Sequence, residues 1–78
     1  MTNIEKYNKA FMESFNISEN ELETVEYQSI KGWDSIGHML LISTLETAFG
    51  IMMETDDIID LSSYKKGKEI LLKYSITV

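Results

Sequence analysis

The chain has 78 residues, 44% of them apolar and 26% charged, which predicts one folded domain with a small core and excludes a large internal active site. It has no cysteine and a single histidine, His38, so disulfides, thiolate metal sites and the multi-histidine centres of metalloenzymes are excluded or disfavoured. The net charge of −6 is concentrated in residues 33–61, which contain six acids and no lysine or arginine. Such a surface repels nucleic-acid phosphates and attracts a basic partner.

The first predicted element is an amphipathic helix over residues 3–15. Its apolar side chains recur at steps of three and four residues, and they are Ile4, Tyr7, Phe11 and Phe15. Residues 16–34 lose this period, and a connection longer than about 12 to 15 residues is usually functional or contains hidden helix. We therefore predict a long first loop with one helical turn at Ser18 to Leu22.

The second predicted helix begins at Ser35 or just before it and ends at Gly50, a residue type that commonly terminates helices. One arc of this helix should face the core, with His38 near its start, and its members are Leu41, Ile42, Leu45, Ala48 and Phe49. Ile36 and Leu40 fall on the opposite, solvent side. Single exposed apolar residues are ordinary, but two on the first turns indicate a contact surface.

Two further helices complete the chain. Thr55 is predicted as the N-cap of a short helix to Leu61, with carboxylates in its first turn. Ser62 or Ser63 should cap the last helix, whose core-facing positions are Tyr64, Gly67, Ile70, Leu71 and Tyr74. The prediction is a single all-α domain, residues 1–78, with three main helices, one short helix and a long first loop.

Ser35 and His38 are the one pair that could serve as a nucleophile and its base. Three residues along a helix turn the two side chains about 60° apart, and no glycine-rich elbow precedes the serine, so a hydrogen-bonded boundary histidine is the favoured interpretation. The sequence also lacks a calcium-binding loop and a phosphate-binding glycine loop. The acids that could otherwise suggest calcium fit the first turn of a helix better, and they are Asp56, Asp57 and Asp60.

The segment Asp34-Ser35-Ile36 resembles the mark of the acyl carrier proteins and their peptidyl and aminoacyl relatives, which have Asp-Ser-Leu where the second helix begins. Further residues occur at the family's spacing without a gap, and they are Leu45, Glu46, Phe49 and Gly50. The first helix and the segments 55–57 and 61–62 also fit. The resemblance therefore covers nearly the whole chain and implies a four-helix carrier-protein bundle.

The resemblance implies that Ser35 carries 4'-phosphopantetheine, transferred from coenzyme A by a separate phosphopantetheinyl transferase. Acyl or related cargo would then travel as a thioester on an imported thiol, and the chain itself would not be an enzyme. Residues on the second helix are expected to dock partner enzymes that have basic patches, and they are Asp34, Ile36, Leu40 and Glu46. Met39, close to Ser35, could line the mouth of a groove for the cargo or simply pack in the core.

Carriers of fatty-acid synthesis usually have additional acids on this helix, where this chain has Leu40 and Thr47. We therefore expect a specialised fatty-acyl, polyketide or surface-polymer pathway, with an aminoacyl or peptidyl carrier as the alternative. An unmodified helical interaction module and a small hydrolase using Ser35 and His38 are the competing classes. Apolar runs such as Met39 to Ile42 are too short to cross a bilayer, and we expect a cytoplasmic monomer.

Overall fold

Four α-helices and one short 3-10 helix make up the protein in the computed structural model, which describes residues Met1–Val78. The helices in chain order are α1 (Asn3–Phe15), η1 (Glu19–Glu21), α2 (Ser35–Phe49), α3 (Thr55–Asp60) and α4 (Tyr64–Leu72). The only β pairing is an isolated antiparallel bridge between Glu26 and Ser63. This arrangement confirms the predicted all-α domain with three main helices and one short one.

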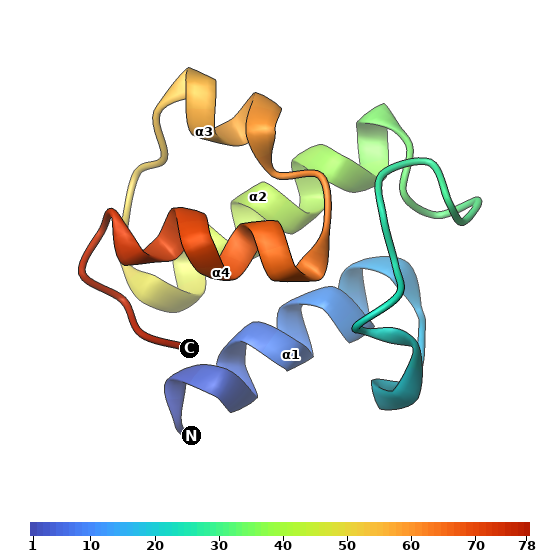
Figure 1. The fold of residues 1–78 in the computed structure, drawn as a ribbon, viewed down its shortest axis with the longest axis horizontal. Helices are drawn as coiled ribbons and strands as arrows, with labels where there is room; N and C mark the ends of the chain where they lie inside the picture. The colour runs from blue at the N-terminus through green and yellow to red at the C-terminus, as the bar shows by residue number, and fades with distance from the viewer.

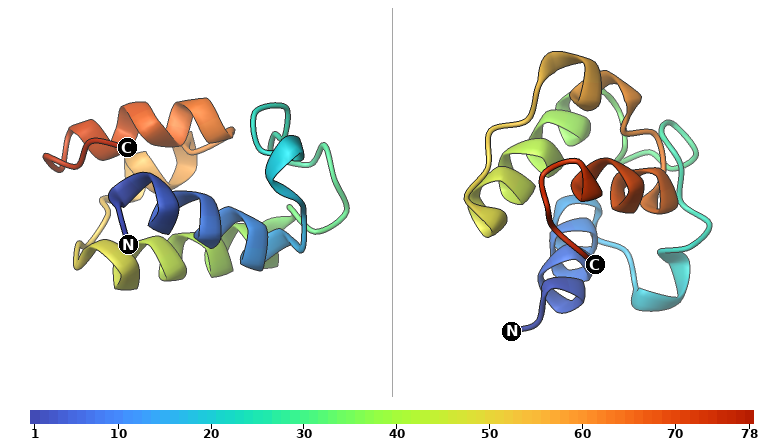
Figure 2. Two further views of the ribbon diagram at one scale, coloured as in Figure 1. Left: turned by 90° about the horizontal axis from the view of Figure 1, so that it is seen from below. Right: turned by 60° about the vertical axis from the view of Figure 1, so that its left-hand side comes forward.

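The helices α1 and α2 lie side by side and run in opposite directions, and α4 packs across them (Figures 1 and 2). The short α3 lies above α2 and α4 in the view of Figure 1, and it connects the end of one to the start of the other. The two chain ends lie close together, because Asn3 Nδ2 donates a hydrogen bond to the Thr77 carbonyl over 3.3 Å. No helix is both long enough and apolar enough to cross a membrane.

Local capping residues set most of the helix boundaries. Thr2 and Glu5 form a reciprocal capping box at the start of α1, and Ser63 caps α4 by accepting a hydrogen bond from Lys66 N. Asp34 caps α2 by accepting from Gly37 N over 2.8 Å. At the other end of α2, Gly50 adopts φ of +63°, which a glycine tolerates without strain.

Both predicted boundaries of the short helix α3 are wrong by one residue. The N-cap of α3 is Glu54 and not Thr55, which is the first helical residue, and Glu54 makes no side-chain capping bond. Instead, Glu54 N donates to the Tyr74 hydroxyl over 2.8 Å, so a distant residue holds the start of this helix. The helix α3 ends at Asp60, and Leu61, predicted as its last residue, is the C-cap.

Aromatic rings fill the middle of the bundle. The rings of Phe15 and Trp33 stack with centroids 4.7 Å apart, and Phe11 meets Trp33 and Tyr64 edge-on. The buried hydroxyl of Tyr7 donates to the Tyr64 carbonyl, and burial raises the pKa of Tyr7 far above its usual range. The core consists of Tyr7, Ala10, Phe11, Phe15, Leu22, Val25, Trp33, Leu41, Ile42, Leu45, Met53, Leu61, Tyr64, Ile70, Leu71 and Ile76.

A buried carboxylate attaches α3 to the C-terminal segment. Asp57 accepts hydrogen bonds from Lys73 Nζ at 2.8 Å and from the Tyr74 hydroxyl at 2.6 Å. The bond from Lys73, followed by that from Tyr74, holds the pKa of Asp57 below its usual value. Asp57 lies in the first turn of α3 as predicted, but it is buried and does not belong to the acidic surface expected over residues 33–61.

Candidate functional site

Ser35 is the first residue of α2, and its side chain is exposed to solvent. Two residues before it, Trp33 is fully buried and stacked on Phe15, so the chain enters the helix from a fixed anchor. Asp34 satisfies the Gly37 N–H, whereas the N–H groups of Ser35 and Ile36 have no carbonyl acceptor inside the helix. The serine hydroxyl thus lies at a well-held helix start that is accessible from outside.

Gly37 lets the first turn of α2 approach the preceding loop closely. A Cβ at Gly37 would overlap the Gly32 carbonyl oxygen, and no backbone carbonyl can move aside without shifting the loop. Our sequence prediction missed this role. The available signal was a glycine in the first turn of a helix, where that residue lowers helix stability and calls for a packing reason.

His38 is fully hydrogen-bonded and makes no hydrogen bond to Ser35. Its Nδ1 accepts from Trp33 Nε1–H over 3.0 Å, which leaves the proton on Nε2 to be donated to the Ile58 carbonyl over 2.7 Å. Its ring is also nearly parallel to that of Trp33. The predicted boundary histidine is confirmed, and its bonds connect the long loop, α2 and α3.

A cavity of about 380 Å³ opens beside Ser35, between the start of α2 and α3. Its lining residues come from the long loop and both helices, and they are Tyr27, Ser35, His38, Met39, Ile58, Ile59, Leu61 and Ser62. The lining is mainly apolar, with the hydroxyl of Ser35 at its edge. Met39 therefore lies at a cavity shared with Ser35, while its predicted contact with a cargo stays a prediction.

The outer face of α2 is apolar. Ile36, Met39 and Leu40 are 82%, 53% and 52% exposed, which confirms the predicted orientation of Ile36 and Leu40. Ile59 of α3 and Met52 before it are exposed as well. Most monomeric proteins do not present several large apolar side chains together without a use for them.

The two acids predicted for docking both have structural contacts. Asp34 Oδ1 is occupied by the capping bond to Gly37 N. Glu46 is half-buried, and its Oε2 accepts from Met53 N over 2.9 Å, which holds the turn after α2. Each carboxylate keeps one oxygen outside these bonds, so their docking role stays a prediction in addition to a defined role in the fold.

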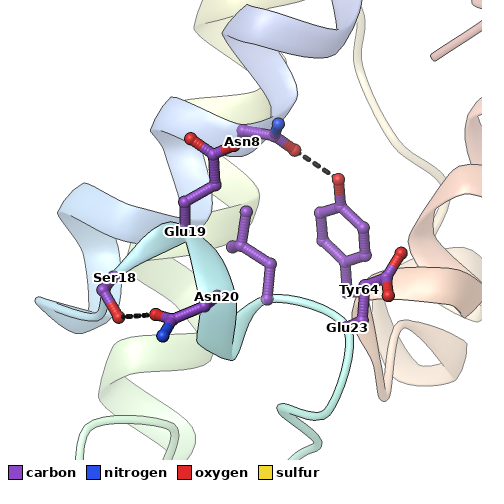
Figure 3. Close-up of a pocket in the computed structure, with 7 residues that line it drawn as sticks. Asn8, Ser18, Glu19, Asn20, Glu23 and Tyr64 are labelled. Carbon is purple, nitrogen blue, oxygen red and sulfur yellow. Dashed lines mark hydrogen bonds between the residues drawn. The ribbon is translucent and has the colours of Figure 1, made fainter.

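The largest cavity, about 680 Å³, lies elsewhere and shares no lining residue with the cavity at Ser35. Figure 3 shows its polar lining, where the Tyr64 hydroxyl donates to Asn8 and the side chains of Ser18 and Asn20 are hydrogen-bonded. Burial, with added repulsion from Glu23 and Glu19, raises the pKa of Tyr64. The bond between Tyr64 and Asn8 joins α4 to α1, whereas the bond between Ser18 and Asn20 is local to the start of η1.

No group of three histidine, aspartate and glutamate side chains converges closely enough to hold a metal ion.

The site at Ser35 combines an exposed hydroxyl, the start of a helix, a mainly apolar cavity and an apolar outer face of α2. Comparisons with protein-family models, with curated proteins and with solved structures find no match to this chain, so the family resemblance of the Ser35 segment stays a prediction.

Proposed function

We propose that this chain is a non-catalytic carrier protein in which Ser35 bears 4'-phosphopantetheine. The observation that carries the proposal is an exposed serine hydroxyl on the first residue of α2, held between the buried Trp33 and the tightly packed Gly37. A fixed, accessible hydroxyl is what a modifying enzyme needs from its substrate. The modification is proposed to be phosphopantetheine because the segment Asp34-Ser35-Ile36 resembles the attachment site of acyl carrier proteins.

The residues around Ser35 fit a phosphodiester. In the modification, Ser35 Oγ forms a bond to phosphorus of the coenzyme A pyrophosphate, the adenosine bisphosphate half leaves, and the hydroxyl proton passes to a base of the transferase. The bound arm would supply the thiol that a chain without cysteine lacks. The free N–H groups of Ser35 and Ile36 and the positive end of the α2 dipole favour a negative group at this point.

His38 supports the carrier over the hydrolase. A hydrolase would need an imidazole nitrogen free to take the Ser35 proton, but both nitrogens already have partners in Trp33 and Ile58. A carrier needs no such base, because the transferase provides it. We expect the purified chain to show no turnover of simple esters, and turnover that is lost in His38→Ala would contradict this.

The outer face of α2 guides the choice of pathway. Leu40 and Thr47 are both exposed and uncharged, whereas docking in carriers of fatty-acid synthesis depends on acids along this helix. We propose docking through apolar contact, with Asp34 and Glu46 as charge contacts, in a specialised fatty-acyl, polyketide or surface-polymer pathway. An aminoacyl or peptidyl carrier is the alternative cargo class.

The first test is the intact mass of the chain after incubation with coenzyme A and a broad-specificity phosphopantetheinyl transferase. We expect a gain of one phosphopantetheine unit. Ser35→Ala should abolish this gain, and Ser43→Ala, which changes another exposed serine of α2, should retain it. If the mass does not increase with any of several transferases, the carrier proposal is contradicted and an unmodified interaction module is favoured. The apolar outer face of α2 would suit such a module as well.

The second test concerns docking. Ile36→Ala and Leu40→Ala should slow cargo transfer by partner enzymes, because both side chains are exposed apolar groups near Ser35. Ser43→Ala is the matched control on the same helix. Circular dichroism should show unchanged helicity in all three variants, and unchanged transfer rates in the first two would contradict the docking proposal.

A further inference from the structure

Tyr27 brings a second hydroxyl to Ser35 from the long loop. The Tyr27 hydroxyl lies 3.4 Å from Ser35 Oγ, at the outer limit of a hydrogen bond. No other side chain has a hydrogen bond to the Ser35 hydroxyl. Tyr27 also lines the cavity beside Ser35, so the same side chain offers a polar end at the serine and an aromatic wall.

The ring of Tyr27 is held in place by two neighbours. Its ring meets that of His38 at 79° with centroids 5.4 Å apart, and that of Trp33 at 87° with centroids 6.4 Å apart. Edge-to-face contacts of this kind are favourable for aromatic pairs. Since Trp33 and His38 are themselves hydrogen-bonded to each other, Tyr27 rests on a rigid base.

The backbone around Tyr27 is fixed on both sides. Tyr27 N donates to the Ser62 carbonyl over 2.8 Å, next to the isolated bridge between Glu26 and Ser63. Gln28 N donates to the Trp33 carbonyl over 2.9 Å, with Gln28 itself at φ of +66°. These bonds connect the loop to the start of α4 and to the residue before the α2 cap. The position of the Tyr27 hydroxyl is therefore a property of the fold.

The contact in the unmodified chain is weak by its length. An O–H···O bond is usually 2.5 to 3.0 Å long, so at 3.4 Å the two hydroxyls stabilise each other little. A hydroxyl donating to an ionised phosphate oxygen makes a shorter and stronger bond. The arrangement is thus better suited to an anionic group attached to Ser35 than to the free serine.

We infer that Tyr27 is a positioning residue for the modified serine: its hydroxyl donates a hydrogen bond to a phosphate oxygen of the group on Ser35, and its ring limits the direction in which the arm leaves. This inference rests on the proposed function. With Tyr27 closing one side, the arm is directed along the cavity wall formed by Met39, Ile58 and Ile59. The cargo would then start from a defined place beside the apolar outer face of α2.

The test compares Tyr27→Phe, which removes only the hydroxyl, with Tyr64→Phe, which removes a hydroxyl bonded to Asn8 in the separate cavity of Figure 3. Each chain is modified with coenzyme A and a transferase, and the phosphorus-31 resonance of the linkage is recorded. We expect Tyr27→Phe to shift this resonance by more than its linewidth and Tyr64→Phe to leave it in place.

Thermal unfolding provides a second readout that does not depend on partner enzymes. We expect the arm to raise the unfolding midpoint of the wild-type chain, and Tyr27→Phe to lose at least half of that rise while its unmodified form matches the unmodified wild type. An unchanged resonance together with an unchanged rise would overturn the role of Tyr27 alone. A wild-type chain that gains no arm mass would overturn the proposed function, and this inference with it.

Discussion

The two long helices, α1 and α2, use their surfaces in different ways. The helix α1 buries apolar residues along one face, and its opposite face carries charges such as Glu5, Lys9 and Glu13. The helix α2 also buries a face, made by Leu41, Ile42 and Leu45. Its opposite face, however, exposes Ile36, Met39 and Leu40 to solvent.

Packing of the fold explains one apolar face on each helix, but it does not explain the second apolar face of α2. A surface helix needs one apolar stripe to pack and gains nothing in stability from a second. The helix α1 is fully explained by packing, because its charged face is solvated. The outer face of α2 is not explained in this way. The excess apolar surface lies at the Ser35 end of the helix, which is the end where we propose that partners bind.

The largest expected effect on stability comes from replacing a leucine by alanine on the buried face of α2, and the same replacement on the outer face is its control. Leu45→Ala should lower the free energy of unfolding by about 2 to 5 kcal/mol, because Leu45 is fully buried and its removal leaves a cavity. Leu40→Ala on the outer face should change it by less than about 0.5 kcal/mol. Urea titration measures both, and comparable losses would mean that the outer face also supports the fold.

A pair of glycines tests the close approach at the start of α2. Gly37→Ala should cost about 1 to 3 kcal/mol, because the new Cβ would overlap the Gly32 carbonyl oxygen. Gly32→Ala is the control, since its Cβ would come no nearer than 3.5 Å to the Phe15 backbone. Equal stability of the two variants in urea would show that the loop yields at no cost, and that Ser35 is not held rigidly from this side.

The helices α1 and α2 are both capped by a side chain at their N-terminus. Thr2→Ala and Asp34→Ala should each cost about 1 kcal/mol, because each removes the side chain that satisfies first-turn N–H groups. Asp34→Asn keeps the capping oxygen without the charge and should restore stability. If Asp34 also docks partners, Asp34→Asn alone should still slow cargo transfer, and a normal transfer rate would limit Asp34 to capping.

The smallest effect concerns the attachment of α3, which lies across the cavity from Ser35 and the start of α2. The pKa of Asp57 lies below its ordinary value of 3.8 in the folded chain, so its bonds stabilise the fold above that value. This contribution should be lost as the pH falls from that value through the lower, folded pKa. Asp57→Asn should flatten the acid limb of the stability curve, whereas Asp60→Asn on the exposed side should leave it steep.

Elements with local signals were predicted well. Asp34 and Gly50 mark the ends of α2 by their own chemistry, and the spacing of Tyr7, Phe11 and Phe15 predicts which face of α1 is buried. The turn at Ser18 to Leu22 was confirmed as η1 for the same reason, since Ser18 and Glu21 form a capping box within four residues.

Features that depend on distant partners were missed. The burial of Asp57 depends on Lys73 and Tyr74, which both follow the end of α4. The contact between Tyr27 and Ser35 depends on a loop backbone bonded to Ser62, and no periodic pattern encodes such a bond. A carboxylate or tyrosine looks the same in sequence whether it faces solvent or a partner, so only the fold reveals its role.

Trp33 gives the molecule a built-in optical reporter. It is the one tryptophan of the chain, it is fully buried, and its indole N–H donates a hydrogen bond to His38, which lines the Ser35 cavity. Excitation of this single ring reads out the joint between the long loop and α2 without an added dye. Emission colour and quenching would follow, in real time, any event at Ser35 that disturbs this joint.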